Sequence, residues 1–268
     1  MIPNILSIAG SDPSGGAGIQ ADIKAIGANG GYAMAAITAL TVQNTQEVRG
    51  VEIVPAEVVR AQISAIRDDI RIDAVKIGML GTAEIVAAVA EALEDLAAPI
   101  VLDPVMVARS GDRLLAPEAV AALRDRLLPM AAVITPNLPE AADLLGSAPA
   151  RDVGGMLEDA ARLRALGARA ALLKGGHLAG SDSPDVLAHP GGIDRLDGPR
   201  HDTRNTHGTG CTLSAALACQ LGRGRPLTEA AGRAKAYTAV AIAAAGRLDV
   251  GHGHGPTHHC HPFDETRP

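Results

Sequence analysis

The sequence predicts an α/β protein, a three-layer α/β/α sandwich in which helices cover both faces of a mostly parallel central sheet. Short apolar runs alternate with longer segments of helical periodicity, and each short run breaks at Gly, Pro or Asn. The 268 residues are 47% hydrophobic and 20% charged, which is enough apolar material to bury a core.

Six short apolar runs are predicted to form buried strands, at 5–9, 35–42, 74–78, 100–103, 132–135 and 170–174. Six segments between them place apolar residues at helical spacing and are rich in Ala, Leu, Glu and Arg. Helices are therefore expected at 56–70, 82–96, 117–128, 138–145, 155–166 and 226–247. Segment 180–205 is richer in Ser, Asp, Pro, Gly and His. Its two weak strand candidates, 185–188 and 193–197, predict a hairpin or edge strands.

Neither a linker nor an internal repeat is visible, so the chain is predicted to be a single domain over residues 1–268. The α/β/α part extends to about residue 250, and residues 251–268 form a polar, His-rich tail. In open α/β sheets the ligand lies beyond the carboxyl ends of the strands. The residues that follow each strand are therefore the candidates for function.

Composition excludes several functional classes. The net charge of -6 and the three aromatic residues argue against nucleic-acid binding, which needs basic surface and stacking platforms. The sequence holds no apolar run of 18 residues and begins without a signal-peptide pattern, so we expect a cytoplasmic protein without membrane contact. The three cysteines, Cys211, Cys219 and Cys260, are too few for a disulfide framework.

The first strand runs into a Gly-rich turn at residues 10–18 that opens a helix. No Lys follows the glycines, so the turn is not a P-loop. Residues 16–21 match the loose dinucleotide fingerprint Gly-x-Gly-x-x-Gly/Ala, but the acid expected about 20 residues later is missing. A dinucleotide site and a purely structural tight turn are both alternatives to a substrate-binding turn.

A second Gly-rich turn, residues 205–212 (Asn-Thr-His-Gly-Thr-Gly-Cys-Thr), also opens a helix. The backbone N–H groups of 208–211, at the positive helix end, predict an anion cradle that fits a phosphoryl group. Cys211 falls in the first helical turn, where the pKa of a thiol is commonly lowered, which makes it a candidate base or nucleophile. The alternative is a small buried cysteine that packs the helix, as we interpret Cys219.

Three further strand ends carry charged or amide groups: Asp103, the pair Asn137 and Glu140, and Lys174. Two carboxylates and one amide oxygen suit Mg²⁺, which prefers hard oxygen ligands and keeps part of its water shell. Lys174 is placed to meet a nucleotide phosphate. Taken singly, Glu140 could be a first-turn acid favoured by the helix dipole, and Asp103 a turn acid before proline.

Together these motifs resemble the hydroxymethylpyrimidine/phosphomethylpyrimidine kinases of thiamine biosynthesis, which are members of the ribokinase-like superfamily. The resemblance covers nearly the whole chain in the right order. It is carried by residues 9–22, 38–44, 75–80, 102–105, 135–141, 173–177 and 205–212, and extends to 250–256.

The resemblance implies a ribokinase-like fold, a homodimer, and ATP- and Mg²⁺-dependent phosphorylation of 4-amino-5-hydroxymethyl-2-methylpyrimidine and then of its monophosphate. By the same resemblance Cys211 takes the place of the aspartate base of most ribokinase-like enzymes, and Gln43 reads the aminopyrimidine edge. The other implied roles are a substrate pocket (Gly10, Asp22, Val42, Met79, Val107), metal and water organisation (Asp103, Asn137, Glu140), nucleotide contacts (Lys174, Thr209, Lys235) and the cradle at Gly208, Thr209 and Gly210.

A cysteine at this position is consistent with two chemically different acceptors. The first acceptor is an alcohol that must lose a proton, whereas the second is a phosphate that is already ionised and needs no base. A fixed carboxylate about 4 Å from that phosphate would repel it by about 4 kcal/mol at an effective dielectric near 20. We therefore hypothesise that a mostly neutral thiol permits both reactions in one pocket.

Three alternatives remain open at this level. The tail carries His252, His254, His258, His259, Cys260 and His261, which could hold zinc or copper, although the resemblance favours a capping segment. An oxidoreductase would use the fingerprint at 16–21, and a non-catalytic pyrimidine- or metal-binding protein would not need Cys211. Some relatives in the superfamily phosphorylate pyridoxal or pyridoxine, so a side activity of that kind is also open.

Overall fold

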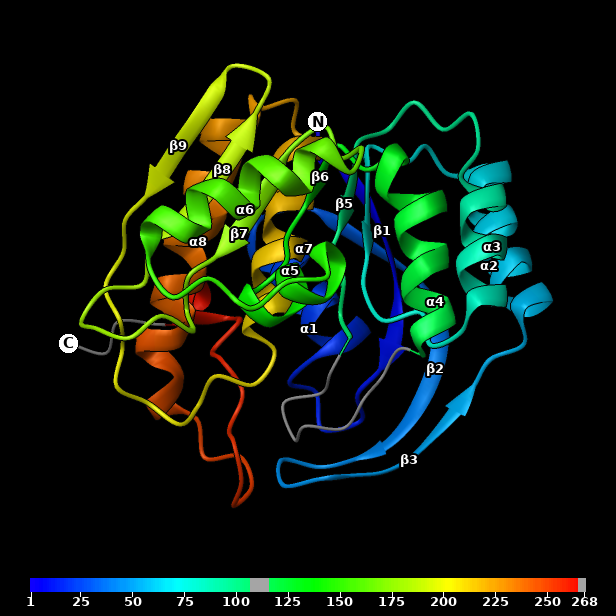
Figure 1. Ribbon diagram of the computed structural model, residues 1–268. Coiled ribbons are helices and arrows are strands. Elements are labelled where there is room, and N and C mark those ends of the chain that lie inside the picture. The colour runs from blue at the N-terminus through cyan, green and yellow to red at the C-terminus, as the bar shows by residue number, and fades with distance from the viewer. Residues whose placement is uncertain (107–115, 265–268) are drawn as a thin grey trace.

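The computed structural model describes residues 1–106 and 116–264. Within them the strands are β1 (Asn4–Ser11), β2 (Tyr32–Gln43), β3 (Val48–Ile53), β4 (Ala74–Ile77), β5 (Ile100–Leu102), β6 (Val133–Ile134), β7 (Ala171–Lys174), β8 (Asp185–His189) and β9 (Gly192–Leu196). The α-helices are α1 (Gly18–Ala28), α2 (Ala56–Asp69), α3 (Ala83–Ala92), α4 (Pro117–Ala122), α5 (Leu138–Leu145), α6 (Val153–Ala165), α7 (Thr209–Gly222) and α8 (Leu227–Ala243). The predicted α/β class is confirmed (Figure 1).

The strands of the described residues form one sheet in the order β3-β2-β1-β4-β5-β6-β7-β8-β9. Six neighbouring strands, β2, β1, β4, β5, β6 and β7, run parallel. At one edge β3 pairs antiparallel with β2, and at the other β8 pairs antiparallel with both β7 and β9. The chain extends the sheet to one side of β1 with β2 and to the other side with β4. This change of direction creates a crevice at the carboxyl ends of β1 and β4. Ligands of α/β proteins bind in such crevices.

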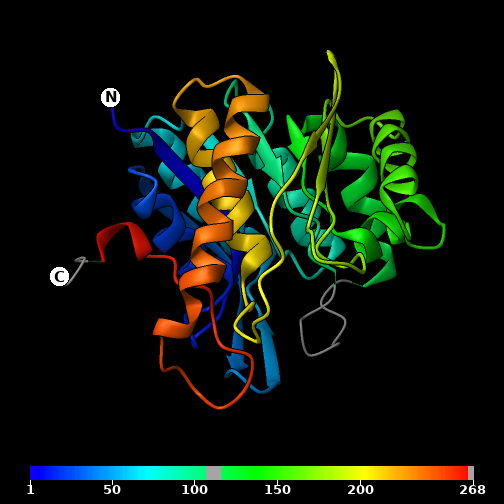
Figure 2. The ribbon, with the colours of Figure 1, turned by 90° about the vertical axis from the view of Figure 1, so that its left-hand side faces the viewer.

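Two apolar cores lie on opposite faces of the sheet. Helices α2 to α6 pack on one face and α1, α7 and α8 on the other (Figures 1 and 2). Successive strand residues alternate between them: in β5, Ile100 and Leu102 join the first core and Val101 the second. This double coverage explains why the parallel strands read as continuous apolar runs.

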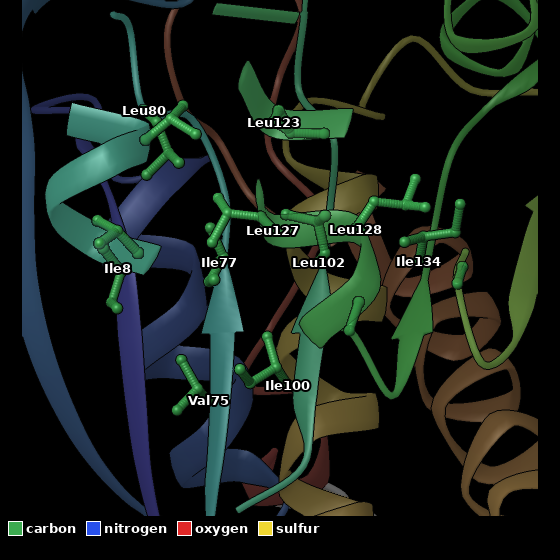
Figure 3. Packing of buried hydrophobic residues seen from close by; sticks show 14 of the residues in the cluster. Ile8, Val75, Ile77, Leu80, Ile100, Leu102, Leu123, Leu127, Leu128 and Ile134 are labelled. Atoms are coloured by element: carbon green, nitrogen blue, oxygen red, sulfur yellow. The ribbon is translucent and has the colours of Figure 1, made fainter. Parts of the chain in front are cut away.

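All six predicted strands and the predicted hairpin are present, the latter as β8 and β9 at an edge. Strand β3 was not predicted. The helix expected at 117–128 is shorter, because it widens into a π-helical turn at Leu123–Leu127 and a 3₁₀ turn containing Pro129, which has no N–H to donate. Leu123, Leu127 and Leu128 from these turns point into the same core as Ile77 and Leu102 (Figure 3).

No helix among the described residues has both the length and the apolar character needed to cross a membrane.

Candidate active site

A cavity of about 1070 Å³ opens at the carboxyl ends of the parallel strands. It exceeds the roughly 300–1,000 Å³ of a site for one drug-sized ligand, so it has room for two small substrates. Twelve of the predicted site residues line it: Gly10, Gln43, Met79, Asp103, Asn137, Glu140, Lys174, Gly208, Thr209, Gly210, Cys211 and Lys235.

The predicted anion cradle lies at the start of α7. Gly208 caps this helix with φ 77°, and a Cβ there would lie 1.8 Å from the carbonyl oxygen of Gly16, so only glycine lets the two Gly-rich turns pack together. Within the described residues the amides of Gly208, Gly210 and Cys211 have no hydrogen-bond partner, whereas that of Thr209 donates to the carbonyl of Thr206. Three of the four predicted amides are therefore available to an anion.

The pKa of Cys211 departs from the sequence-based expectation. Burial raises the pKa of this thiol to about 11, and the carboxylates of Asp22 and Asp103 act in the same direction, while Lys76 only partly opposes them. The prediction of a lowered pKa was wrong because burial and buried carboxylates outweigh the helix end. At neutral pH the thiol is uncharged. The alternative of a cysteine that merely packs the helix applies to Cys219, which is fully buried between α7 and α1.

Asp103 and Lys174 form a buried ion pair beside the cradle. The Lys174 ammonium lies 3.1 Å from Asp103 Oδ1, which also accepts from Thr135 Oγ1. Burial disfavours the carboxylate, but the charges of Lys174 and Lys76 and these hydrogen bonds hold the pKa of Asp103 below its ordinary value. A Cβ on Gly210 would lie 3.2 Å from Lys174 Nζ and 3.5 Å from Asp103 Oδ2. The predicted phosphate-binding and metal-organising groups therefore meet at the cradle.

Glu140 and Asn137 form a capping box at the start of α5. The Asn137 side-chain oxygen accepts from Glu140 N at 2.9 Å, and Glu140 Oε2 accepts from Asn137 N at 2.7 Å. The structural interpretation of Glu140 as a first-turn acid is thus correct. Glu140 Oε2 also lies 3.9 Å from Lys174 Nζ, and burial raises the pKa of this carboxyl to about 7.

This raised pKa predicts a pH-dependent stability in the absence of ligands. The Glu140 carboxyl has an ordinary pKa of 4.5, as in an unfolded chain, and a pKa of about 7 in the folded protein. The folded state therefore favours the protonated acid. The contribution of this carboxyl to the free energy of unfolding is fully present below pH 4.5 and is lost as the pH rises through 7. Relative to Glu140→Gln, the free energy of unfolding should therefore fall over this window by about 3 kcal/mol, at about 1.4 kcal/mol per pKa unit. Denaturant unfolding of both proteins across this pH range measures the difference. The same pH dependence of the free energy of unfolding in both proteins would contradict the assignment.

The first Gly-rich turn is organised by Asp12. Its carboxylate accepts from the amides of Ser14 and Ala17 and lies 2.8 Å from His207 Nε2. Although burial favours the neutral acid, these hydrogen bonds lower the pKa of Asp12. His207 Nε2 is also 3.4 Å from Gln43 Nε2, so the first Gly-rich turn and the predicted pyrimidine-reading amide both lie next to this residue of the cradle turn.

Two predicted pocket residues do not line the cavity. Asp22 is fully buried behind it, 2.8 Å from Lys76 Nζ and 2.6 Å from Ser7 Oγ. Val42 is 61% exposed, because its side chain faces outward on the β2–β3 hairpin. Val107 lies outside the described residues.

Lys76 lines the cavity but was not predicted as a site residue. The sequence does mark this residue, because Lys76 is the only charged residue within the otherwise apolar run 74–77.

Lys235 lines the cavity, but its ammonium is already bound. It donates to Asp185 Oδ2 and to the carbonyl of Ser183, both at 2.7 Å, and so ties α8 to the first strand of the hairpin β8–β9. Its predicted contact with the nucleotide would have to be made from this anchored position.

The His-rich tail packs against the cradle turn and the β2–β3 hairpin. His207 N donates to the carbonyl of Gly255, and His254 N donates to that of Thr45 (Figures 1 and 2). Among the described residues the tail histidines form no group of three or more metal ligands. His259 is buried, which lowers its pKa to about 4. These contacts support the capping interpretation.

The parallel sheet, the amide cradle, and the carboxylates and ammonium groups at its edge define a small-molecule kinase of the ribokinase-like class. The family model described as phosphomethylpyrimidine kinase matches residues 12–258. The chain belongs to this family.

Relatives and solved structures agree with this assignment. The hydroxymethylpyrimidine/phosphomethylpyrimidine kinase of Rhizobium meliloti (strain 1021) is 53% identical over 256 residues, which cover 96% of each chain. Its counterpart in Escherichia coli (strain K12) is 52% identical over 261 residues, covering 97% of this chain and 98% of the relative. An ADP complex of Bacillus subtilis pyridoxal kinase has a TM-score of 0.87 at 38% identity, covering 97% of this chain and 98% of that chain.

Proposed function

We propose that this protein transfers the γ-phosphoryl group of ATP first to the hydroxymethyl group of 4-amino-5-hydroxymethyl-2-methylpyrimidine and then to the resulting monophosphate. The product is the pyrophosphate that thiamine biosynthesis consumes. Family membership and the names of the relatives support this activity. The observation that carries the two-step form is the uncharged thiol of Cys211 beside an amide cradle, where most ribokinase-like enzymes place a carboxylate.

In the first transfer the acceptor is a neutral alcohol. The free amides of Gly208, Gly210 and Cys211 would hold the negative charge of the migrating phosphoryl group. A thiol with a pKa of about 11 is a poor base at neutral pH, so it cannot remove the proton at the outset. The loose transition state of phosphoryl transfer requires little prior deprotonation. Cys211 would then serve as a neutral neighbour of the acceptor oxygen, and the proton of the alcohol would leave late, to an oxygen of the transferred phosphoryl group or to water.

In the second transfer the acceptor is an anion. A neutral Cys211 leaves room for that charge, whereas a carboxylate would repel it by about 4 kcal/mol at 4 Å and an effective dielectric near 20. We assign the aminopyrimidine edge to Gln43, whose side-chain oxygen accepts from Thr41 Oγ1 at 3.1 Å. Gly10 and Met79 line the same cavity.

Mg²⁺ belongs to the proposal, and the residues present fit it. Asp103 is ionised, and Glu140 is a second hard-oxygen donor nearby, with a pKa raised by burial that a cation would lower again. One or two carboxylates plus substrate phosphates are the usual protein environment of Mg²⁺. Asp103 and Glu140 would hold the ion or its waters. The side-chain oxygen of Asn137 would also contribute, as far as its capping hydrogen bond from Glu140 N leaves it free. The ion supplies charge neutralisation for the phosphates.

The direct test is ADP release from Mg-ATP with each of the two pyrimidines as the acceptor. We expect turnover with both, and formation of the monophosphate before the pyrophosphate. A protein that releases ADP with neither would contradict the proposed function.

Phosphorylation of pyridoxal is the second candidate function. It is favoured by the structural similarity to Bacillus subtilis pyridoxal kinase. Pyridoxal also presents a hydroxymethyl group on a nitrogen heterocycle. Comparison of kcat/KM for the two alcohols decides which is the main substrate.

The proposal also includes a homodimer in the cytoplasm. Leu40, Val42 and Val51 expose apolar side chains on the β2–β3 hairpin, where a second copy could bury them. The free state of Cys211, Cys219 and Cys260 fits a reducing compartment. Light scattering of the purified protein measures the oligomeric state.

A further inference from the structure

Lys76 is a fully buried cation in the centre of the sheet. It lies on β4, whose four residues are all buried, and its side chain is 0% exposed. A buried ammonium is costly unless a partner compensates it. The group that compensates Lys76 therefore indicates what the charge is for.

The carboxylates of Asp22 and Asp103 compensate the charge of Lys76, but its hydrogen bonding within the protein is incomplete. An ammonium has three hydrogens to donate. In the described residues Lys76 donates only to Asp22 Oδ2, at 2.8 Å, and that oxygen is shared with Ser7 Oγ. The other carboxylate oxygen, Asp22 Oδ1, is buried without a partner. Asp22 thus holds the ammonium from the α1 side and leaves two of its hydrogens unused.

The fold opens a space for this ammonium at the cavity. A Cβ on Gly78 would lie 2.7 Å from Lys76 Nζ, so a larger residue there would displace the charge. Lys76 lines the cavity together with Cys211 and Asp103, whereas Asp22 does not. Lys76 is close enough to Cys211 for its charge to act on the thiol. The ammonium is 0% exposed, so a ligand beside the thiol reaches the unused hydrogens when the residues between them shift.

We propose that Lys76 binds the phosphate of the monophosphate substrate, and that this buried ammonium is the residue that lets the pocket accept the second, anionic acceptor. The inference rests on the proposed function, since it assigns Lys76 to the second of its two reactions.

The charges at the site support the assignment of Lys76 to the second reaction. A phosphate monoester carries about -1.5 to -2 charges at pH 7 and needs a cation when it is bound away from water. Lys174 is already paired with Asp103 at 3.1 Å and with Glu140 at 3.9 Å, and it is the ammonium that we assign to the nucleotide. Lys76 lines the same cavity as Cys211 and has hydrogens to spare. An alcohol has no charge to satisfy, so it should depend on Lys76 far less.

The test compares the double variant Asp22→Asn/Lys76→Met with the single variant Asp22→Asn. The double variant removes the ammonium without leaving a buried carboxylate alone, and Asp22→Asn is its matched control. Calorimetry without ATP should show affinity for the monophosphate about 10- to 100-fold weaker in the double variant, as expected for lost hydrogen bonds to a charged group. Affinity for the unphosphorylated pyrimidine should change less than about 3-fold because no charge is bound there.

Equal losses for both pyrimidines, or no loss for either, would overturn the role of Lys76 while the proposed function stands. A wild-type protein that phosphorylates neither pyrimidine would overturn both. If the variants fail to fold, a crystal structure of the wild type with the monophosphate decides. A phosphate oxygen within about 3.2 Å of Lys76 Nζ supports the proposal, and a phosphate beyond contact with Lys76 contradicts it.

Discussion

Replacement of Cys211 by aspartate should slow the second phosphorylation about 1,000-fold while the first remains within about 10-fold of wild type. A carboxylate about 4 Å from the phosphate of the monophosphate adds about 4 kcal/mol of repulsion at an effective dielectric near 20, and each 1.4 kcal/mol is a factor of ten. The first acceptor carries no charge, and a carboxylate is a better base than a thiol whose pKa is about 11. Separate kcat/KM values for the two acceptors measure the difference.

Cys211→Asn is the matched control, because it is nearly isosteric with aspartate but uncharged. It should keep most of the second activity. If Cys211→Asp phosphorylates the monophosphate as fast as wild type, charge repulsion does not explain the cysteine.

Replacement of Asp103 by asparagine should lower both activities about 100- to 1,000-fold. The carboxylate is the principal partner of the Lys174 ammonium, at 3.1 Å, and is 1% exposed. Breaking a buried pair from one side costs about 3–5 kcal/mol, because the remaining charge is left uncompensated. It also removes the ionised oxygen ligand that we assign to Mg²⁺. ADP release with each acceptor, at several Mg²⁺ concentrations, measures the loss.

Ser214→Ala is the control for the packing around Asp103. Ser214 Oγ donates to Asp103 Oδ2 at 3.2 Å, so its loss removes one hydrogen bond but no charge. The effect should stay within about 10-fold, as for one neutral donor. A loss in Asp103→Asn confined to one acceptor would contradict a role in handling the nucleotide, which both reactions share.

The sequence predicts the sheet well because the parallel strands are covered on both faces. Runs such as 100–102 and 170–173 are uniformly apolar, and the structure places them in the parallel part of the sheet. β3 was missed because it lies at an edge, where Arg49 and Glu52 interrupt the apolar pattern. The cradle and the groups around it could be found because each follows a strand or opens a helix.

The electrostatics of the site could not be predicted in the same way. The position of Cys211 in the first turn of a helix suggests a lowered pKa, but the buried charges around it come from distant parts of the chain: Asp22 on α1, Lys76 on β4 and Asp103 after β5. Their sum with burial reverses the expected direction. Asp22 was assigned to the pocket by the family resemblance, whereas in the structure its carboxylate does not line the cavity and accepts from Lys76.

The most direct measurement is a crystal structure of the protein with a non-hydrolysable ATP analogue and the pyrimidine. We predict that the terminal phosphorus lies against the free amides of Gly208, Gly210 and Cys211, with the acceptor oxygen next to the cysteine sulfur. A terminal phosphorus bound elsewhere in the cavity, out of reach of these amides, would contradict this assignment of the phosphoryl-transfer site.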